Sequence, residues 1–225
     1  MNAQGKRSGE TAREYAYRMI REQVISLELK PGEAFNDMEF AAKIGVSRTP
    51  VREAVIQLSE ESRIIEIFPQ RGMRIAPIDV ELVEEARSLR VLLEKQIAGM
   101  CCEMATEEDI KWLQENVGLQ EFYMENSRPE MVMQLDDEMH HKLFMICHRE
   151  LTYGMCQKLA IHYDRIRSLS VHTLKDNTII EDHRKIIQFI AEHKKENAMA
   201  QMEKHLSRWQ LNEGKFRQKF PDYFK

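Results

Sequence analysis

The stretch "LDDEMHHKL", residues 135–143, places two carboxylates and two histidines within nine residues. Asp136 and His140 are four positions apart, so that on an α-helix both side chains lie on one face, about one turn from each other. Carboxylate and imidazole groups presented in this way are suitable metal ligands. The same residues also fit an acidic, solvated helix face, and the spacing alone does not decide between these two interpretations.

The apolar residues of this stretch indicate which polar residues face inward. Three of them recur at helical spacing: Leu135, Met139 and Leu143. A helix that buries these three carries Asp136 and His140 beside the buried stripe, where they can face an internal cavity. The other polar residues then face solvent: Asp137, Glu138 and His141. With eight histidines in the chain, a lone aspartate and histidine at this spacing are more often surface residues than ligands.

A second group of residues has the chemistry of DNA recognition. Arg48, Thr49 and Arg52 lie at the start of a predicted helix, and the two arginines share one face. Arginine can bond to two atoms of guanine in the major groove, and threonine can contact phosphate or a thymine methyl group. An exposed arginine pair is also ordinary solvated surface. The Arg71-Gly72 pair at the tip of a predicted hairpin favours DNA binding, because glycine lets the backbone approach DNA closely.

The elements that position these arginines are those of a winged helix-turn-helix. Apolar periodicity and capping signals predict three helices and two short strands: helices over 11–29, 36–45 and 47–62, and strands over 64–68 and 72–77. Asn36 and Ser47 are the predicted N-caps, and Gly45 ends the second helix. Two helices joined by a tight glycine turn form a helix-turn-helix, and the two strands form a wing.

The chain changes character after Pro77, beyond which glycine and proline are rare. Helical periodicity predicts six or seven further helices, with approximate spans 79–103, 106–126, 129–147, 151–170, 178–194 and 197–213. We therefore predict a mainly α protein, with an N-terminal winged helix-turn-helix in residues 1–77 and an all-α helical bundle in residues 78–225. Residues 75–79 are the predicted linker.

Composition limits the classes of protein that fit. The net charge is −4, and residues 1–77 carry 12 Lys and Arg against 11 Asp and Glu, so that any DNA contact must come from individually placed arginines. We find neither a secretory signal nor an apolar run long enough to span a membrane, which indicates a cytoplasmic protein. The four cysteines lack metal-finger spacing and are interpreted as reduced core thiols.

The segment from Leu29 to Pro77 resembles the winged helix of the GntR family of bacterial transcription regulators. The most specific part is "SRTPVREA" followed by "RG" in the wing. The resemblance implies DNA contacts from Arg48, Thr49, Arg52 and the wing tip Arg71-Gly72. This sequence has Met38 where some members of the family have an arginine, so that a base contact from that position is not expected.

The all-α C-terminal domain resembles the FCD subfamily of GntR regulators, whose helical bundle holds a small-molecule cavity. Many of these domains bind a metal through an aspartate, a histidine four residues later and two histidines on later helices. The resemblance assigns these places to Asp136, His140, His183 and His205. Three imidazoles and a carboxylate suit a divalent transition metal, with zinc favoured over nickel, iron and manganese, and leave room for a ligand carboxylate.

Arg90 lies among apolar residues of the first predicted bundle helix, where burial without an anionic partner is costly. A salt bridge with Glu94, one turn on, is one explanation. The FCD resemblance favours another, in which Arg90 binds the carboxylate of the effector. The remaining histidines are interpreted as surface or satisfied polar residues: His148, His162, His172 and His193.

Together these features predict a homodimeric transcription regulator that binds a palindromic double-stranded DNA operator. A small organic acid, bound at the metal and Arg90, is expected to control operator affinity. Two alternatives stay open: a regulator that senses the metal ion itself, and a metal-dependent hydrolytic enzyme. The enzyme is disfavoured, because no additional general base accompanies the four ligands.

Overall fold

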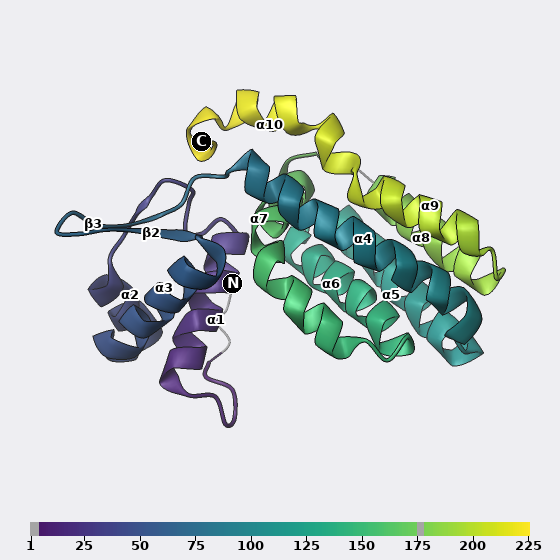
Figure 1. Cartoon of the computed structure of the whole chain (residues 1–225), viewed down its shortest axis with the longest axis horizontal. Coiled ribbons are helices and arrows are strands. Elements are labelled where there is room, and N and C mark those ends of the chain that lie inside the picture. The colour runs from purple at the N-terminus through teal and green to yellow at the C-terminus, as the bar shows by residue number, and fades with distance from the viewer. Residues whose placement is uncertain (1–4, 175–177) are drawn as a thin grey trace. The chain divides into compact units, whose positions relative to one another are not determined.

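The computed structural model describes residues 5–174 and 178–225 of the chain. These residues form two compact units, Met1–Val80 together with Arg217–Lys225, and Glu81–Phe216. Figure 1 follows the chain through a small sheet and short helices at the N-terminal end and then through a set of longer helices. The predicted fold class is confirmed, since the chain is mainly α with an N-terminal winged helix-turn-helix and a helical C-terminal part.

The first unit contains the predicted helices and wing. Its helices are α1 (Ala12–Ile25), α2 (Asp37–Ile44) and α3 (Arg48–Ser62), and its strands are β1 (Ala34–Phe35), β2 (Ile65–Phe68) and β3 (Gly72–Ile75). Asn36 caps α2 by accepting hydrogen bonds from the backbone N–H groups of Met38 and Glu39, and Gly45 ends it at φ 74°. Ser47 holds the N-cap position of α3, but its side chain makes no capping hydrogen bond.

The sheet of the first unit has three strands, so that the prediction of two was incomplete. The strand order is β1-β3-β2, and both pairings are antiparallel. The additional strand, β1, is only two residues long, which is too short to show an alternating pattern in the sequence. The core of the first unit includes three residues of α3 that are fully buried: Val51, Val55 and Leu58.

Residues 217–225 return to the first unit after the chain has completed the second. Ile78 and Phe224 form a parallel bridge, in which the Ile78 N–H donates to the Tyr223 carbonyl (2.7 Å) and the Lys225 N–H donates to the Ile78 carbonyl (3.0 Å). Lys225 also pairs with Asp79 at 3.0 Å. The predicted linker is therefore held in place by the last residues of the chain, a contact that no feature of the sequence indicated.

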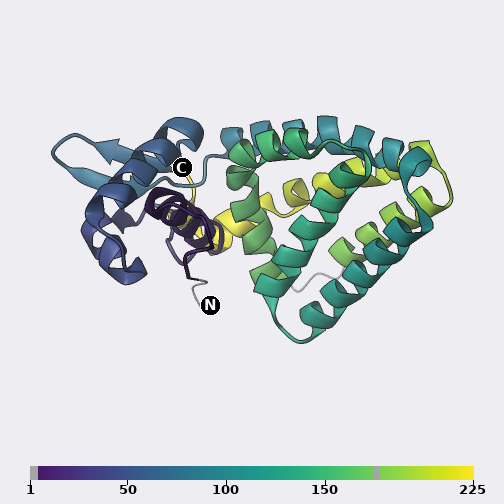
Figure 2. The same cartoon turned by 90° about the horizontal axis from the view of Figure 1, so that it is seen from below.

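The second unit is a helical bundle (Figure 2). Its helices are α4 (Val80–Met104), α5 (Glu107–Glu125), α6 (Pro129–Ile146), α7 (Glu150–Leu174), α8 (Thr178–Ala191), α9 (Lys195–Leu206), the 3-10 helix η1 (Arg208–Leu211) and α10 (Glu213–Lys219), which is followed in the first unit by η2 (Pro221–Tyr223). Thr106 and Asp109 form a capping box at the start of α5. α5 packs against α6 and α8, and α8 packs against α9, so that ligands from α6, α8 and α9 can converge.

The cysteines are buried free thiols within the second unit, as predicted: Cys101, Cys102, Cys147 and Cys156. Over the residues that the structure describes, no helix combines the length and apolar character needed to cross a membrane.

Candidate DNA interface and metal site

The start of α3 presents the predicted DNA-reading residues to solvent. Arg48, Thr49 and Arg52 are all exposed and lie outside the buried stripe of α3. Arg48 is not free, because its Nε donates to Oδ1 of Asp37 at 3.0 Å, and Asp37 is buried at the start of α2. This contact orients Arg48 from the preceding helix of the motif, whereas no ion pair involves Arg52 among the described residues.

The wing tip carries the second predicted contact. Arg71 and Gly72 are exposed in the turn between β2 and β3, where Gly72 has φ 98° and Gln70 has φ 60°. A left-handed conformation at position 72 is one that glycine adopts without steric cost. Arg74 lies on β3, pairs with Glu66 on β2 and covers the Phe68 ring at 5.3 Å. Arg71 is therefore the cation that the wing leaves available.

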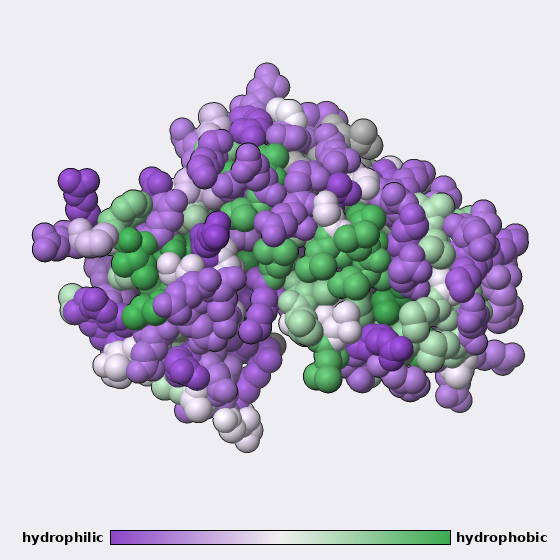
Figure 3. Space-filling model, viewed as in Figure 1, coloured by the Kyte–Doolittle hydropathy of each residue, from purple (hydrophilic) through white to green (hydrophobic). Residues whose placement is uncertain are grey.

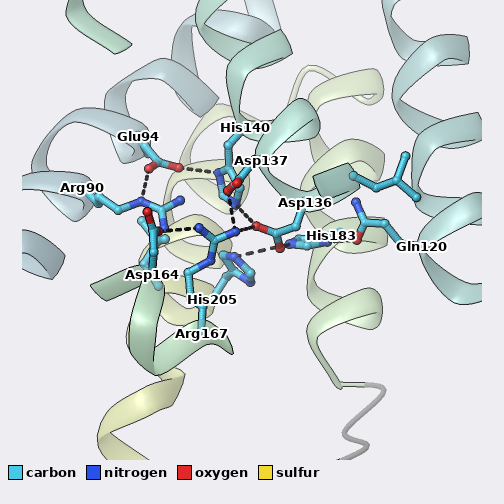
Figure 4. Close-up of polar contacts among 12 residues, drawn as sticks. Arg90, Glu94, Gln120, Asp136, Asp137, His140, Asp164, Arg167, His183 and His205 are labelled. Atoms are coloured by element: carbon cyan, nitrogen blue, oxygen red, sulfur yellow. Dashed lines mark hydrogen bonds and ion pairs between the residues drawn. The ribbon is translucent and has the colours of Figure 1, made fainter. Parts of the chain in front are cut away.

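The four residues assigned to a metal come together inside the second unit (Figure 4). Asp136 and His140 extend from α6, His183 from α8 and His205 from α9. One potential ligand atom of each lies within 4.8 Å of those of the others, and all four residues are buried. The structure therefore unites residues that are up to 69 positions apart in the sequence.

The ring of His183 is oriented by two residues of α5. Its Nδ1 lies 2.8 Å from Oε1 of Gln120, and Nε2 of Gln120 donates to Oδ1 of Asn116 at 2.7 Å. Because an amide oxygen only accepts, Nδ1 of His183 carries the proton and Nε2 carries the lone pair. That lone pair faces Oδ1 of Asp136 at 3.3 Å and Nε2 of His205 at 3.3 Å.

The ring of His140 is oriented from α4. Oε2 of Glu94 contacts Nδ1 of His140, and Oε1 of Glu94 accepts from Nε of Arg90 at 2.5 Å. Burial acts to raise the pKa of Glu94, but Arg90 and His140 hold it well below its ordinary value. Glu94 is therefore an ionised acceptor that directs Nε2 of His140 toward the other three ligands.

Asp136 divides its two oxygens between the ligands and an arginine. Oδ1 faces His183, while Oδ2 pairs with Arg167 of α7. Burial acts to raise the pKa of Asp136, but the Arg167 guanidinium holds it well below its ordinary value. Arg167 also donates to Asp137 (2.8 Å) and Asp164 (2.7 Å), so that three carboxylates surround this one cation.

His205 is held less firmly than the other two imidazoles. Its Nδ1 is buried and has no hydrogen-bond partner among the described residues. Burial lowers the pKa of His183 to about 4 and places that of His205 well below its ordinary value, so that both rings are neutral at neutral pH. Neutral imidazole is the form that binds a metal.

A cavity of about 50 Å³ adjoins this cluster. Its polar wall includes Arg90, Asp136, Arg167 and His205, and its apolar wall includes Val132 and Ile166. Nη1 of Arg90 is buried without a hydrogen-bond partner among the described residues, although Nε is bonded to Glu94. The predicted salt bridge is therefore present, and it leaves Nη1 of the guanidinium available as a donor.

The neighbours of the ligands on α6 differ from their predicted surroundings in one respect. Glu138 is exposed, and the partly exposed His141 stacks on Tyr153 with ring centroids 4.5 Å apart. Asp137 was expected to face solvent only, but it pairs with Arg167. Neither Arg167 nor Gln120 was predicted as a ligand or as a supporting residue. Arg167 is one of two arginines among the apolar residues of α7, and a cation in such a setting is the same signal that marked Arg90.

Two of the remaining histidines bond to backbone oxygens, as satisfied polar residues do. Nδ1 of His172 lies 2.7 Å from the Ser168 carbonyl, and Nδ1 of His193 lies 2.6 Å from the Cys102 carbonyl.

Comparison with known families identifies both units. Residues 12–75 match the family described as "Bacterial regulatory proteins, gntR family", and residues 85–208 match the FCD domain. The chain belongs to the GntR family, with an FCD domain. It is therefore a DNA-binding transcriptional regulator with an effector-binding domain, and the predicted assignment to a regulator instead of an enzyme is confirmed.

Bacterial transcriptional regulators match along most of the chain. The HTH-type transcriptional repressor RspR of Escherichia coli K12 is 27% identical over 209 residues, which cover 92% of this chain and 91% of that protein. The Nta operon transcriptional regulator of Aminobacter aminovorans is 26% identical over 185 residues, 82% of this chain and 86% of that protein. Among solved structures, E. coli McbR/YncC superposes with a TM-score of 0.78 at 17% identity, covering 93% and 99% of the two chains.

Proposed function

We propose that this GntR regulator is a homodimer whose affinity for a palindromic operator is controlled by a small carboxylate effector. The effector binds at a metal held by Asp136, His140, His183 and His205, and its carboxylate also pairs with Arg90. One observation supports this proposal above all. The Nε2 lone pair of His183 and an oxygen of ionised Asp136 face each other at 3.3 Å, and two acceptors at that distance repel each other unless a cation lies between them.

A divalent transition metal supplies such a cation. Three imidazoles and one carboxylate are donors that zinc accepts readily, and nickel, iron and manganese also use them. Arg167 does not already fill this role, because its guanidinium is bonded to Oδ2 of Asp136 and to two further carboxylates. When bound, the metal acts as a Lewis acid that can take a carboxylate oxygen of the effector.

Arg90 supports the carboxylate part of the proposal. Its Nη1 is buried without a partner among the described residues and lines the cavity beside the ligands. A buried donor without a partner costs about 1–3 kcal/mol, which an anionic ligand would recover. The planar guanidinium matches the geometry of a carboxylate.

The DNA-binding part rests on α3 and the wing. Arg48, Thr49, Arg52 and the Arg71-Gly72 tip are exposed as groove and phosphate contacts require. A homodimer reading two half-sites strengthens the binding of a domain that has little net charge. The second unit also exposes apolar surface on the face covered by α4 (Figure 3), where Leu92 is 69% exposed, and on α7, where Leu151 is 88% exposed. Such surface is typical of a protein-protein interface.

Elemental analysis and native mass spectrometry of the purified protein test the proposal. We expect one transition metal per chain, together with a co-purified organic acid. His140→Ala and His183→Ala are expected to lose the metal, while the matched surface variant His148→Ala retains it. A metal content that does not change in the ligand variants would refute the site.

The small cavity favours a second candidate function, in which the metal ion itself is the effector. A volume of about 50 Å³ holds only a few non-hydrogen atoms unless the side chains move. Operator affinity measured during a zinc titration, with no organic acid present, separates the two functions. A full change in affinity with metal alone would establish the ion sensor and remove the carboxylate effector.

A further inference from the structure

α5 contributes none of the four candidate ligands, yet two of its polar side chains lie in the interior beside them. Asn116 and Gln120 are four residues apart, and so they share one face of the helix. Their exposed fractions are 3% and 0%. Burying neutral amides costs free energy unless their donors and acceptors are hydrogen-bonded. The hydrogen-bond partners of Asn116 and Gln120 therefore indicate the role of this pair.

The hydrogen bonds of the pair can be assigned in only one way. Nδ2 of Asn116 donates to the backbone carbonyl of Leu135 at 3.1 Å, and that carbonyl can only accept. Oδ1 of Asn116 therefore accepts from Nε2 of Gln120, and Oε1 of Gln120 is directed at Nδ1 of His183. Reversing either amide would place two acceptors or two donors opposite each other.

The resulting chain of hydrogen bonds links two ligands from different helices. It begins at Leu135, the residue before Asp136 on α6, and ends on the ring of His183 on α8. Both the tautomer of His183 and its separation from Asp136 are therefore tied to one backbone carbonyl. His205 on α9 differs, because its Nδ1 has no hydrogen-bond partner in the part of the chain that the structure describes.

We propose that Gln120, supported by Asn116, is a positioning residue that holds His183 in the Nδ1–H tautomer, with its Nε2 lone pair aimed at the space beside Asp136. The inference rests on the metal site proposed above. It implies that the Asp136–His183 half of that site is formed before the metal arrives, and that His205 completes it.

Zinc affinity, measured by competition with a chelator, tests the role of Gln120. Gln120→Leu removes the acceptor and is expected to weaken zinc binding by about 10- to 100-fold. Gln120→Glu retains an acceptor for Nδ1–H and is expected to bind zinc within about threefold of the unchanged protein, although its second oxygen opposes Oδ1 of Asn116. The matched control is Gln114→Leu, at an exposed position on the same helix, which should leave the affinity unchanged.

The tautomer provides a second readout, which packing alone would not change. In metal-free protein, the ¹⁵N shifts of the His183 ring should report Nδ1–H in the unchanged chain and in Gln120→Glu, and a mixture of tautomers in Gln120→Leu. Asn116→Ala serves if Gln120→Leu fails to fold, and it is expected to produce a smaller loss of zinc affinity, because Gln120 can then reverse.

Two results would overturn the inference. One is an unchanged zinc affinity with an unchanged His183 tautomer in Gln120→Leu. The other is an equal loss of affinity in Gln120→Glu and Gln120→Leu, which would indicate a packing role. Failure of the metal site itself is recognised separately, because His183→Ala would then retain whatever metal the unchanged protein binds.

Discussion

The two units of this regulator use arginine in opposite ways. In the first unit Arg52 and Arg71 are exposed and have no ion-pair partner among the described residues, so that phosphate or base oxygens can replace water around them. In the second unit Arg90 is buried, Arg167 keeps only 13% of its side chain exposed, and both are bonded to carboxylates. An exposed arginine can be replaced without loss of the fold. A buried arginine is part of the structure, because it and the carboxylates bonded to it neutralise one another.

Removing the most heavily bonded of the buried arginines is expected to have the largest effect. Arg167→Met leaves three carboxylates without their shared cation: Asp136, Asp137 and Asp164. Breaking a buried ion pair in this way costs about 3–5 kcal/mol, and we expect urea unfolding of the second unit to report a loss of that size. Arg184→Met is the control, because its ion pair with Glu121 is exposed and should be worth less than about 1 kcal/mol. Equal losses in the two variants would contradict the comparison.

Acid is expected to destabilise the second unit before the first. All eight histidines lie beyond residue 139, and burial lowers the pKa of His183 to about 4. The unfolded chain therefore takes up a proton near pH 6.5 that the folded metal-free protein does not, and stability falls by up to about 1.4 kcal/mol per pH unit from pH 6.5 down to about 4. Above pH 6.5 the ring of His183 is neutral in both the folded and the unfolded chain, and it causes no loss of stability there.

Tryptophan fluorescence can follow this acid effect, because both tryptophans, at positions 112 and 209, belong to the second unit. Metal-free protein should unfold at lower urea concentration at pH 5 than at pH 7.5. His183→Gln should show a weaker pH dependence, and an unchanged dependence would show that His183 is not the responsible group. Added zinc should reduce the loss at pH 5, since metal and protons compete for the same nitrogen.

Operator binding probes the exposed arginines. Arg52→Ala is expected to cost about 1–3 kcal/mol in operator affinity, to relax base preference and to leave thermal stability unchanged. Arg13→Ala, at an exposed position on α1, is the control. An equal loss of affinity for operator and random DNA would show that Arg52 contacts a phosphate and no base.

The same contrast between exposed and buried residues explains what could be predicted from the sequence. Some predictions depend only on residues within one or two helical turns, as for Arg48, Arg52 and the N-cap Asn36. In the structure both arginines are exposed and Asn36 caps α2. The Asp136–His140 pair is local as well, but its union with His183 and His205 was inferred from family resemblance, because periodicity does not show which helices become neighbours. Gln120 was missed for this reason: its partner His183 lies 63 residues away.

Arg167 and the return of residues 217–225 show two further limits. An arginine among apolar residues of a helix indicates a charge that is largely removed from solvent, but the sequence does not identify the carboxylates that will surround it. The C-terminal segment pairs with Ile78 through backbone hydrogen bonds, which any side chain other than proline permits. No residue type therefore marks that contact in advance.

The smallest effect is expected at the wing, where the comparison can be made between two neighbouring arginines. Arg71 is exposed at the tip, whereas Arg74 pairs with Glu66 and covers Phe68. If Arg71 contacts a phosphate, Arg71→Ala should weaken binding to operator and random DNA alike and reduce the slope of log affinity against log salt by about 0.9. Arg74→Ala should change that slope little, because Arg74 must leave Glu66 to reach DNA. The slopes are obtained from affinities measured between low and moderate salt. Equal slopes for the two variants would mean that the ion pair with Glu66 does not keep Arg74 from DNA. The contrast between the exposed Arg71 and the paired Arg74 would then not predict which arginine binds DNA.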